Sequence, residues 1–227
     1  MPDPAPNAEL LRSLGRLVRG LSALFWGLPL TLIVCVETAE SSNLHSFNVL
    51  PPVLTTGLLV YGLRQLSYFQ KQERIWIKAL DWAIMLGLVD TGLSPFLFWW
   101  NQRPDQEFYV VMVSLLAASG IIFLSSLNLV LYRLSAMLPD ESLRLETRYF
   151  TTLNRFVLLA ILLLGSLFLL WPRFSGLPVL PLNLDRLVTS GGPWLIVFLA
   201  LVPLALTMAM VWKIKQVILD SVFGAGR

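Results

Sequence analysis

The stretch FYVVMVSLLAASGIIFLSSLNLVLY, residues 108–132, contains no charged side chain and is long enough to cross a lipid bilayer as a helix. The hydrocarbon core of a bilayer is about 30 Å thick and an α-helix rises about 1.5 Å per residue, so roughly 20 mostly apolar residues form one crossing. Five further apolar runs occur along the 227-residue chain. The sequence therefore predicts an all-α, polytopic integral membrane protein with a bundle of six transmembrane helices.

The apolar runs leave little sequence for a domain in water. Residues 1–7 are rich in proline and are expected to be disordered, whereas residues 8–227 are expected to form a single membrane domain. Pro51 and Pro52 suit the start of the second span, because the first N–H groups of a helix have no intrahelical partner in any case. We expect the six spans at residues 21–36, 51–65, 76–100, 108–132, 153–171 and 193–212.

Short amphipathic cytoplasmic helices are expected beside the spans. Asn7 is a candidate N-cap for the first, whose leucines, Leu14 and Leu17 among them, lie on one side and whose arginines lie on the other. We expect this helix to lie along the membrane surface and the chain to turn inward at Gly20. A second surface helix is expected to begin near Pro139 and to continue directly into the fifth span.

The composition excludes several classes of protein. Hydrophobic residues make up 56% of the chain and charged residues only 14%, against about a quarter in soluble domains. The net charge of +3 comes from cations beside apolar runs, so we expect membrane lipids and no nucleic acid as partners. Cys35 is the only cysteine and His45 the only histidine, which excludes an intramolecular disulfide, a bis-histidine haem and a multi-histidine zinc site. No cofactor is expected.

The distribution of lysine and arginine predicts the orientation, because positive charge beside a span resists translocation and stays cytoplasmic. If the N-terminus is cytoplasmic, all 17 of these residues except Arg103, Arg173 and Arg186 fall in cytoplasmic segments. We therefore expect both termini in the cytoplasm, an even number of spans and a bacterial-type inner (cytoplasmic) membrane.

The spans that return to the cytoplasm end alike, at Tyr61–Arg64, Tyr132–Arg133 and Trp212–Lys213. Two interpretations stay open. An aromatic ring followed by a cation is ordinary chemistry at a membrane boundary, so the three ends can have converged on one anchor. Alternatively, the bundle consists of three duplicated helical hairpins.

Asp90 is the strongest candidate for a functional side chain, because an ionisable group inside a bilayer is costly. It lies near the middle of the third span, five residues before Pro95, which favours a break or kink in the helix. Thr55 and Thr56 in the second span and Ser114 and Ser119 in the fourth are possible hydroxyl partners. Without a cation nearby, burial favours the neutral acid, which fits both a hydrogen bond between helices and a proton- or cation-coupling site.

Asp81 lies closer to the cytoplasmic end of the third span, at about the depth of Asn128 in the fourth. We expect its carboxylate to bond to Asn128 or to reach Lys78, and so to hold a hairpin together. Asn154 and Arg155, at the start of the fifth span, are expected to form an interface anchor, with Arg155 reaching lipid headgroups.

Small residues in the second and fourth spans, such as Gly57 and Gly120, are expected to let spans two, three and four pack as the tight centre of the bundle. The fifth span offers almost no polar group to another helix, so we expect it to face lipid or an apolar partner subunit.

No phosphate loop, HExxH or Gly-x-Ser-x-Gly motif is present. We therefore expect no enzyme, but a non-catalytic scaffold or accessory subunit that binds other membrane subunits or itself. The first alternative is a small transporter or channel in which Asp90 carries a proton or cation. The second is an enzyme acting on a lipid substrate, for which Glu37, Glu40 and His45 would have to converge.

Overall fold

In the computed structural model, the described residues are 5–40, 47–70, 72–138, 140–174 and 192–223. They form helices and no strands, which confirms the all-α class for this part of the chain. The helices are α1 (Ala5–Glu40), α2 (Leu50–Leu66), α3 (Arg74–Leu93), α4 (Pro95–Gln102), α5 (Glu107–Ala136), α6 (Glu141–Phe174) and α8 (Gly192–Phe223).

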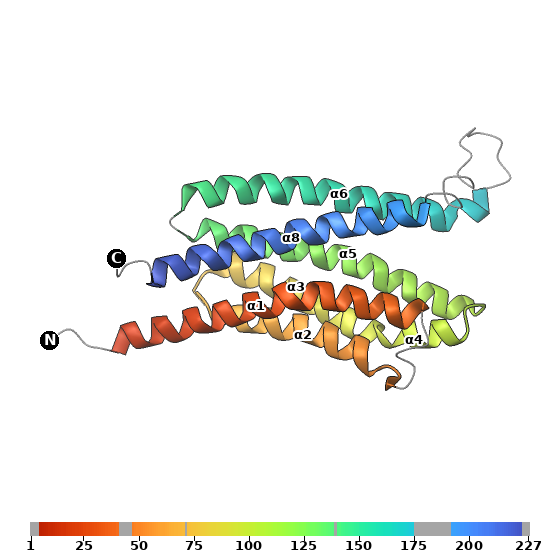
Figure 1. Ribbon diagram of the computed structural model, residues 1–227, viewed down its shortest axis with the longest axis horizontal. Helices are drawn as coiled ribbons and strands as arrows, with labels where there is room; N and C mark the ends of the chain where they lie inside the picture. The colour runs from red at the N-terminus through yellow and green to blue at the C-terminus, as the bar shows by residue number, and fades with distance from the viewer. Residues whose placement is uncertain (1–4, 41–46, 71, 139, 175–191, 224–227) are drawn as a thin grey trace.

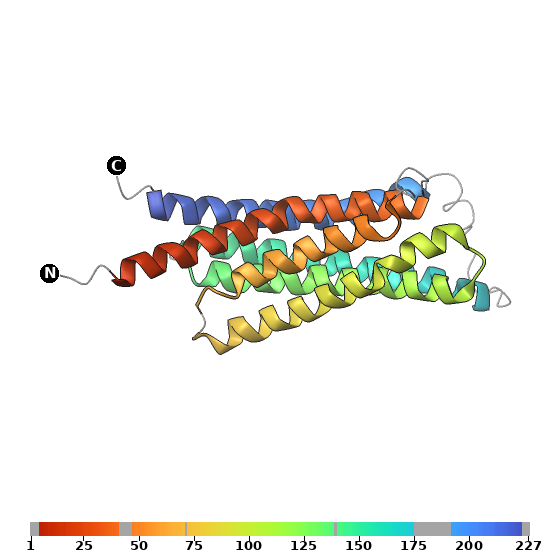
Figure 2. The same ribbon diagram turned by 90° about the horizontal axis from the view of Figure 1, so that it is seen from below.

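The long helices lie side by side along the long axis of the molecule, and the start of α1 and the end of α8 lie at the same end of it (Figures 1 and 2). Helix α1 packs most closely on α2, and α3 on α5. Further contacts join α2 to α3, α5 to α6, α6 to α8 and α8 back to α1, so each long helix has two main neighbours. The core is apolar and draws residues from α1, α2, α3, α5, α6 and α8, with Leu143 as the contribution of α6.

Five helical segments of the described chain are long and apolar enough to cross a membrane. They are Arg12–Glu40, Arg74–Gln102, Glu107–Ala136, Glu141–Ser166 and Ala200–Asp220. The chain therefore has the features of a multi-pass membrane protein. Helix α2 occupies the position of the predicted second span but has only 17 residues and is not one of the five, so a sixth crossing stays a prediction.

The predicted turn at Gly20 is wrong, because α1 runs without interruption from Ala5 to Glu40. Because α1 starts at Ala5, Asn7 lies inside the helix and is not its N-cap. Residues 5–7, which were expected to be disordered, are helical, and residues 1–4 lie outside the described residues. The physical reason is packing: Leu17 and Leu21 are fully buried in the core, so the segment expected on the membrane surface continues the first span.

Gly20 serves helix packing instead. A Cβ atom placed on Gly20 would lie 2.7 Å from the carbonyl oxygen of Gly62 in α2, and one on Gly62 would lie 3.1 Å from the carbonyl oxygen of Gly20. Only two glycines let the backbones come this close. By contrast, a Cβ on Gly57 or Gly120 would meet nothing within 4 Å, so these residues do not mediate the close packing expected of them.

The predicted break before Pro95 is confirmed, since α3 ends at Leu93 and α4 begins at Pro95. Proline has no N–H for the carbonyl four residues earlier, which here belongs to Thr91. The Ser94 hydroxyl donates to the Thr91 carbonyl oxygen at 2.9 Å. The Ser94 N–H donates to the backbone carbonyl oxygen of Asp90 at 2.9 Å. The break therefore leaves no freed carbonyl at Thr91, as a low-dielectric environment requires.

Helix α6 joins the predicted second surface helix and the fifth span in one element, as expected. Its outer face carries large apolar side chains with high exposure, including Phe156 at 67%, Leu159 at 54% and Leu163 at 61%. In an aqueous protein such a row would be a liability, but it suits contact with lipid or with another apolar helix.

Candidate functional site

Asp90 is buried, with 8% of its surface exposed, and its carboxylate accepts a hydrogen bond from the Ser119 hydroxyl of α5. Ser119 is one of the four hydroxyl partners proposed from the sequence. The Cys35 thiol of α1 lies within electrostatic range of Asp90. Asp90 therefore links α3 to α5 beside α1, at the turn of helix that precedes the Pro95 break.

Thr55 and Thr56 are buried in α2 but do not share a hydrogen bond with Asp90 in the described structure. Thr56 donates to the Pro52 carbonyl oxygen at 2.7 Å, and Thr55 to that of Pro51 at 3.1 Å. Hydroxyls inside apolar helices commonly bond to the preceding turn in this way. The polar site expected to unite α2, α3 and α5 is thus reduced to the Asp90–Ser119 pair.

Of the two partners expected for Asp81, Asn128 or Lys78, the Asn128 alternative is wrong. Asp81 is exposed on α3, whereas Asn128 is buried in α5 and directs its polar atoms elsewhere. The Asn128 Nδ2 donates to the Leu124 carbonyl oxygen at 2.9 Å, and the Asn128 Oδ1 accepts from the Thr207 hydroxyl of α8 at 3.1 Å. An exposed carboxylate keeps its solvation, so it gains little from entering the core.

Asn128 belongs instead to a buried polar network that joins α5, α6 and α8. Asn154 of α6 donates through Nδ2 to the Thr207 hydroxyl at 2.9 Å and to the Pro203 carbonyl oxygen at 3.1 Å. Thr207 also donates to the Pro203 oxygen at 2.7 Å, so its single proton is shared between Pro203 and Asn128. The sequence predicts an interface position for Asn154 and no role for Thr207. Each is a polar residue within an apolar run, which is the signal that could have indicated this network.

Two buried polar atoms near this network lack a hydrogen-bond partner in the described structure. They are Asn154 Oδ1 and Thr151 Oγ1, which lie one turn apart on α6. A cavity of about 190 Å³ lies beside Thr151, between α3, α5 and α6. It is lined by Trp82, Ser125, Ser126, Asn128, Leu129, Thr151 and Arg155.

A second hollow, of about 440 Å³, lies along the arginine side of α1. It is lined by Arg12, Gly15, Arg16 and Arg19, and the Arg16 guanidinium stacks over the Tyr68 ring at 4.5 Å. These arginines form the polar side of the amphipathic segment that the sequence predicts near the start of the chain.

The proposed catalytic trio is not assembled in the described residues. Glu37 and Glu40 lie in the last turn of α1, and His45 lies outside the described part of the chain. Within the described residues, no group of three or more His, Cys, Asp or Glu side chains is placed to hold a metal ion.

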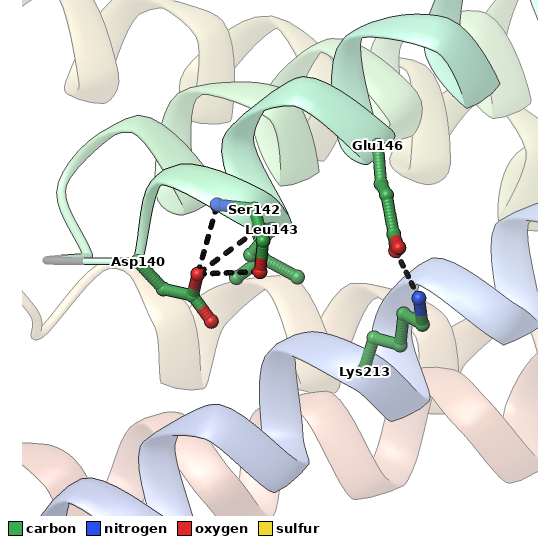
Figure 3. A network of polar contacts seen from close by, with 5 residues as sticks. All are labelled: Asp140, Ser142, Leu143, Glu146 and Lys213. Atoms are coloured by element: carbon green, nitrogen blue, oxygen red, sulfur yellow. Dashed lines mark hydrogen bonds and ion pairs between the residues drawn. The ribbon is translucent and has the colours of Figure 1, made fainter.

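The start of α6 carries a polar network outside the predicted spans, which Figure 3 shows. One carboxylate oxygen of Asp140 accepts hydrogen bonds from the Ser142 hydroxyl at 2.7 Å, the Ser142 N–H at 2.9 Å and the Leu143 N–H at 3.2 Å. Asp140 is therefore the N-cap of α6. Farther along α6, Glu146 forms an ion pair with Lys213 of α8. Both side chains are about half exposed, so the pair contributes little to stability.

The hydrogen bonds from Ser142 and Leu143 lower the pKa of Asp140 from its usual value of 3.8. A lowered pKa means that the cap stabilises α6 above that usual value and loses its effect as the pH falls through the lowered pKa. We expect amide hydrogen exchange at the first turn of α6 to speed up on acidification below about pH 4, beyond the intrinsic pH effect. Asp140→Asn keeps a capping oxygen that does not titrate, so its exchange should follow the intrinsic pH effect alone. Equal behaviour of the two proteins would contradict this assignment.

Comparisons with protein-family models, with curated proteins and with solved structures find no match for this chain.

Proposed function

We propose that this chain is a non-catalytic scaffold or accessory subunit of a membrane complex. In this proposal, residues 8–227 form one membrane domain that crosses a bacterial-type inner membrane six times, with α2 as the shortest crossing. The excess of lysine and arginine at one end of the bundle supports cytoplasmic termini. The position of the start of α1 and the end of α8 at one end of the molecule agrees with this (Figure 1).

The observation that carries the proposal is the use of Asp90. Its carboxylate is buried and bonded to Ser119, so it ties two helices together, and neither of the two cavities described above is lined by it. The Asn128–Thr207–Asn154 network ties α5 to α6 and α8 in the same way. The polar groups thus serve the bundle itself, while the exposed apolar face of α6 is free to contact a partner.

The test is purification of the tagged chain from native membranes in mild detergent, followed by identification of the accompanying proteins. We expect a stoichiometric partner that is retained by wild type and lost from a Phe156→Ala/Leu163→Ala variant, because these side chains form the outer face of α6. Val111→Ala/Leu115→Ala truncates two exposed apolar side chains on α5 and is the control. A solitary, well-behaved monomer would overturn the proposal.

The alternative, proton or cation coupling at Asp90, predicts a different outcome for Asp90→Asn. The amide keeps an oxygen that accepts from Ser119, so under our proposal this variant should change unfolding stability by less than about 1 kcal/mol and should assemble normally. Thermal unfolding in detergent measures the stability, and ion flux into proteoliposomes measures coupling. Ion flux in wild type that disappears in an intact Asp90→Asn variant would establish the transport function instead.

A further inference from the structure

We infer that the cavity between α3, α5 and α6 binds the phosphate headgroup of an anionic membrane phospholipid. This cavity, which we call the α3/α5/α6 groove, measures about 190 Å³. At about 30 Å³ per water molecule, it has room for a phosphate group with its ester oxygens. Trp82 and Leu129 line it and are exposed at 54% and 43%, so the groove opens on the outer surface, where lipid would lie.

The floor of the groove is built from hydrogen-bonding groups. Ser125 and Ser126 come from α5 and Thr151 from α6. Asn128 of α5 also lines the groove, but its amide is bonded to Leu124 and Thr207. The Thr151 hydroxyl is buried and has no partner in the described structure. Leaving such a group unsatisfied is costly, so it indicates a site whose acceptor or donor comes from outside the chain.

Arg155 supplies the charge. It is exposed, it lines the groove, and the one ion pair among the described residues joins Glu146 to Lys213, so Arg155 has no carboxylate partner there. A guanidinium binds phosphate oxygens through two parallel hydrogen bonds, which gives both strength and orientation. An arginine beside hydroxyl groups is therefore the chemistry expected for a phosphodiester.

The surroundings fit the end of a bilayer leaflet. Lys78 precedes Trp82 by four residues on α3, and Arg133 follows Leu129 by four on α5, about one helical turn in each case. Both cations are exposed and lie toward the cytoplasmic ends of their helices, where anionic headgroups gather. The exposed Asp81 is the one carboxylate adjacent in sequence to the lining residues, and it leaves the local balance positive.

An acyl chain would have a path away from the groove. Leu159 and Leu163 follow Arg155 by one and two turns on α6 and are exposed at 54% and 61%. A lipid whose phosphate is bound at Arg155 would therefore lay its chain along this apolar row. Free inorganic phosphate would gain nothing from the row, so we assign the phospholipid as the ligand.

The test titrates the purified full chain, in neutral detergent, with dioleoylphosphatidylglycerol and counts bound lipid by native mass spectrometry. We expect Arg155→Gln to weaken binding by about tenfold or more and Thr151→Val by about threefold to tenfold. Two controls lie outside the groove. Arg148→Gln removes a cation from the same helix, and Thr152→Val removes a neighbouring exposed hydroxyl that bonds to the Arg148 carbonyl oxygen. Both should bind lipid within about twofold of wild type.

A second measurement separates binding from folding. Without lipid, Thr151→Val should melt at a temperature equal to or above that of wild type, because it removes an unpartnered buried hydroxyl; with lipid, it should gain less stability than wild type. Equal lipid binding by all variants, equal binding of dioleoylphosphatidylcholine, or displacement of the lipid by inorganic phosphate would each overturn the assignment. For this test the chain is produced in a heterologous host, apart from its native membrane partners, so the result is independent of the proposed scaffold function.

Discussion

Replacing Gly20 with alanine is expected to destabilise the folded chain by about 1–3 kcal/mol, the range observed when a methyl group is forced into a packed contact. The new Cβ would lie 2.7 Å from the Gly62 carbonyl oxygen and would also collide with the Leu66 side chain. Leu66 is fully buried and the carbonyl belongs to the α2 backbone, so neither can rotate away and α1 must separate from α2.

Thermal or denaturant unfolding in detergent measures this effect. Gly15→Ala is the matched control, because it lies in the same helix and its new Cβ would meet nothing within 4 Å. That variant should be neutral or more stable by about 0.5–1 kcal/mol, since alanine favours helix over glycine. If Gly20→Ala were as stable as Gly15→Ala, the close approach of α1 and α2 would be refuted.

Replacing Thr207 with valine should destabilise the bundle by about 1–2 kcal/mol. Valine keeps the shape of threonine but removes the hydroxyl that donates to Asn128 and accepts from Asn154. The Asn128 Oδ1 would then lose its donor, and Asn154 Nδ2 would keep only the Pro203 oxygen, although both side chains are buried.

Unfolding of wild type, Thr207→Val and Thr207→Ser in mixed micelles checks this result. Serine retains the hydroxyl and should restore most of the lost stability. Thr152→Val, which removes an exposed hydroxyl that bonds only to the Arg148 oxygen, should stay within about 0.5 kcal/mol of wild type. A Thr207→Val protein with wild-type stability would mean that the three-helix network does not hold α5, α6 and α8 together.

Several features of the fold could be predicted because they depend on local chemistry alone. Apolar runs of sufficient length become helices in a low-dielectric environment whatever surrounds them. The interruption at Pro95 follows from a missing N–H, and the continuity of α6 follows from an unbroken helical pattern after Pro139. These predictions needed no knowledge of which helices touch.

The failures share one cause, which is that helix pairing was unknown. A glycine between a basic amphipathic segment and an apolar run predicts a turn at Gly20. In the structure Gly20 instead lets α1 approach Gly62 of α2, which no local pattern indicates. Asn128 was paired with Asp81 on depth alone, but its partner Thr207 lies 79 residues away on α8. Thr55 and Thr56 were possible hydrogen-bond partners for Asp90, but each hydroxyl donates to a backbone carbonyl oxygen within α2.

The order of apolar and basic segments thus determined on its own that this chain is helical and suited to a membrane, since hydrophobic length and flanking charge act one segment at a time. Only the tertiary structure decided which polar groups meet: Ser119 with Asp90, Thr207 with Asn128 and Asn154, and Thr151 with Arg155 in the lining of the α3/α5/α6 groove. Those pairings depend on the rotation and register of neighbouring helices, which side-chain packing selects and no single segment encodes.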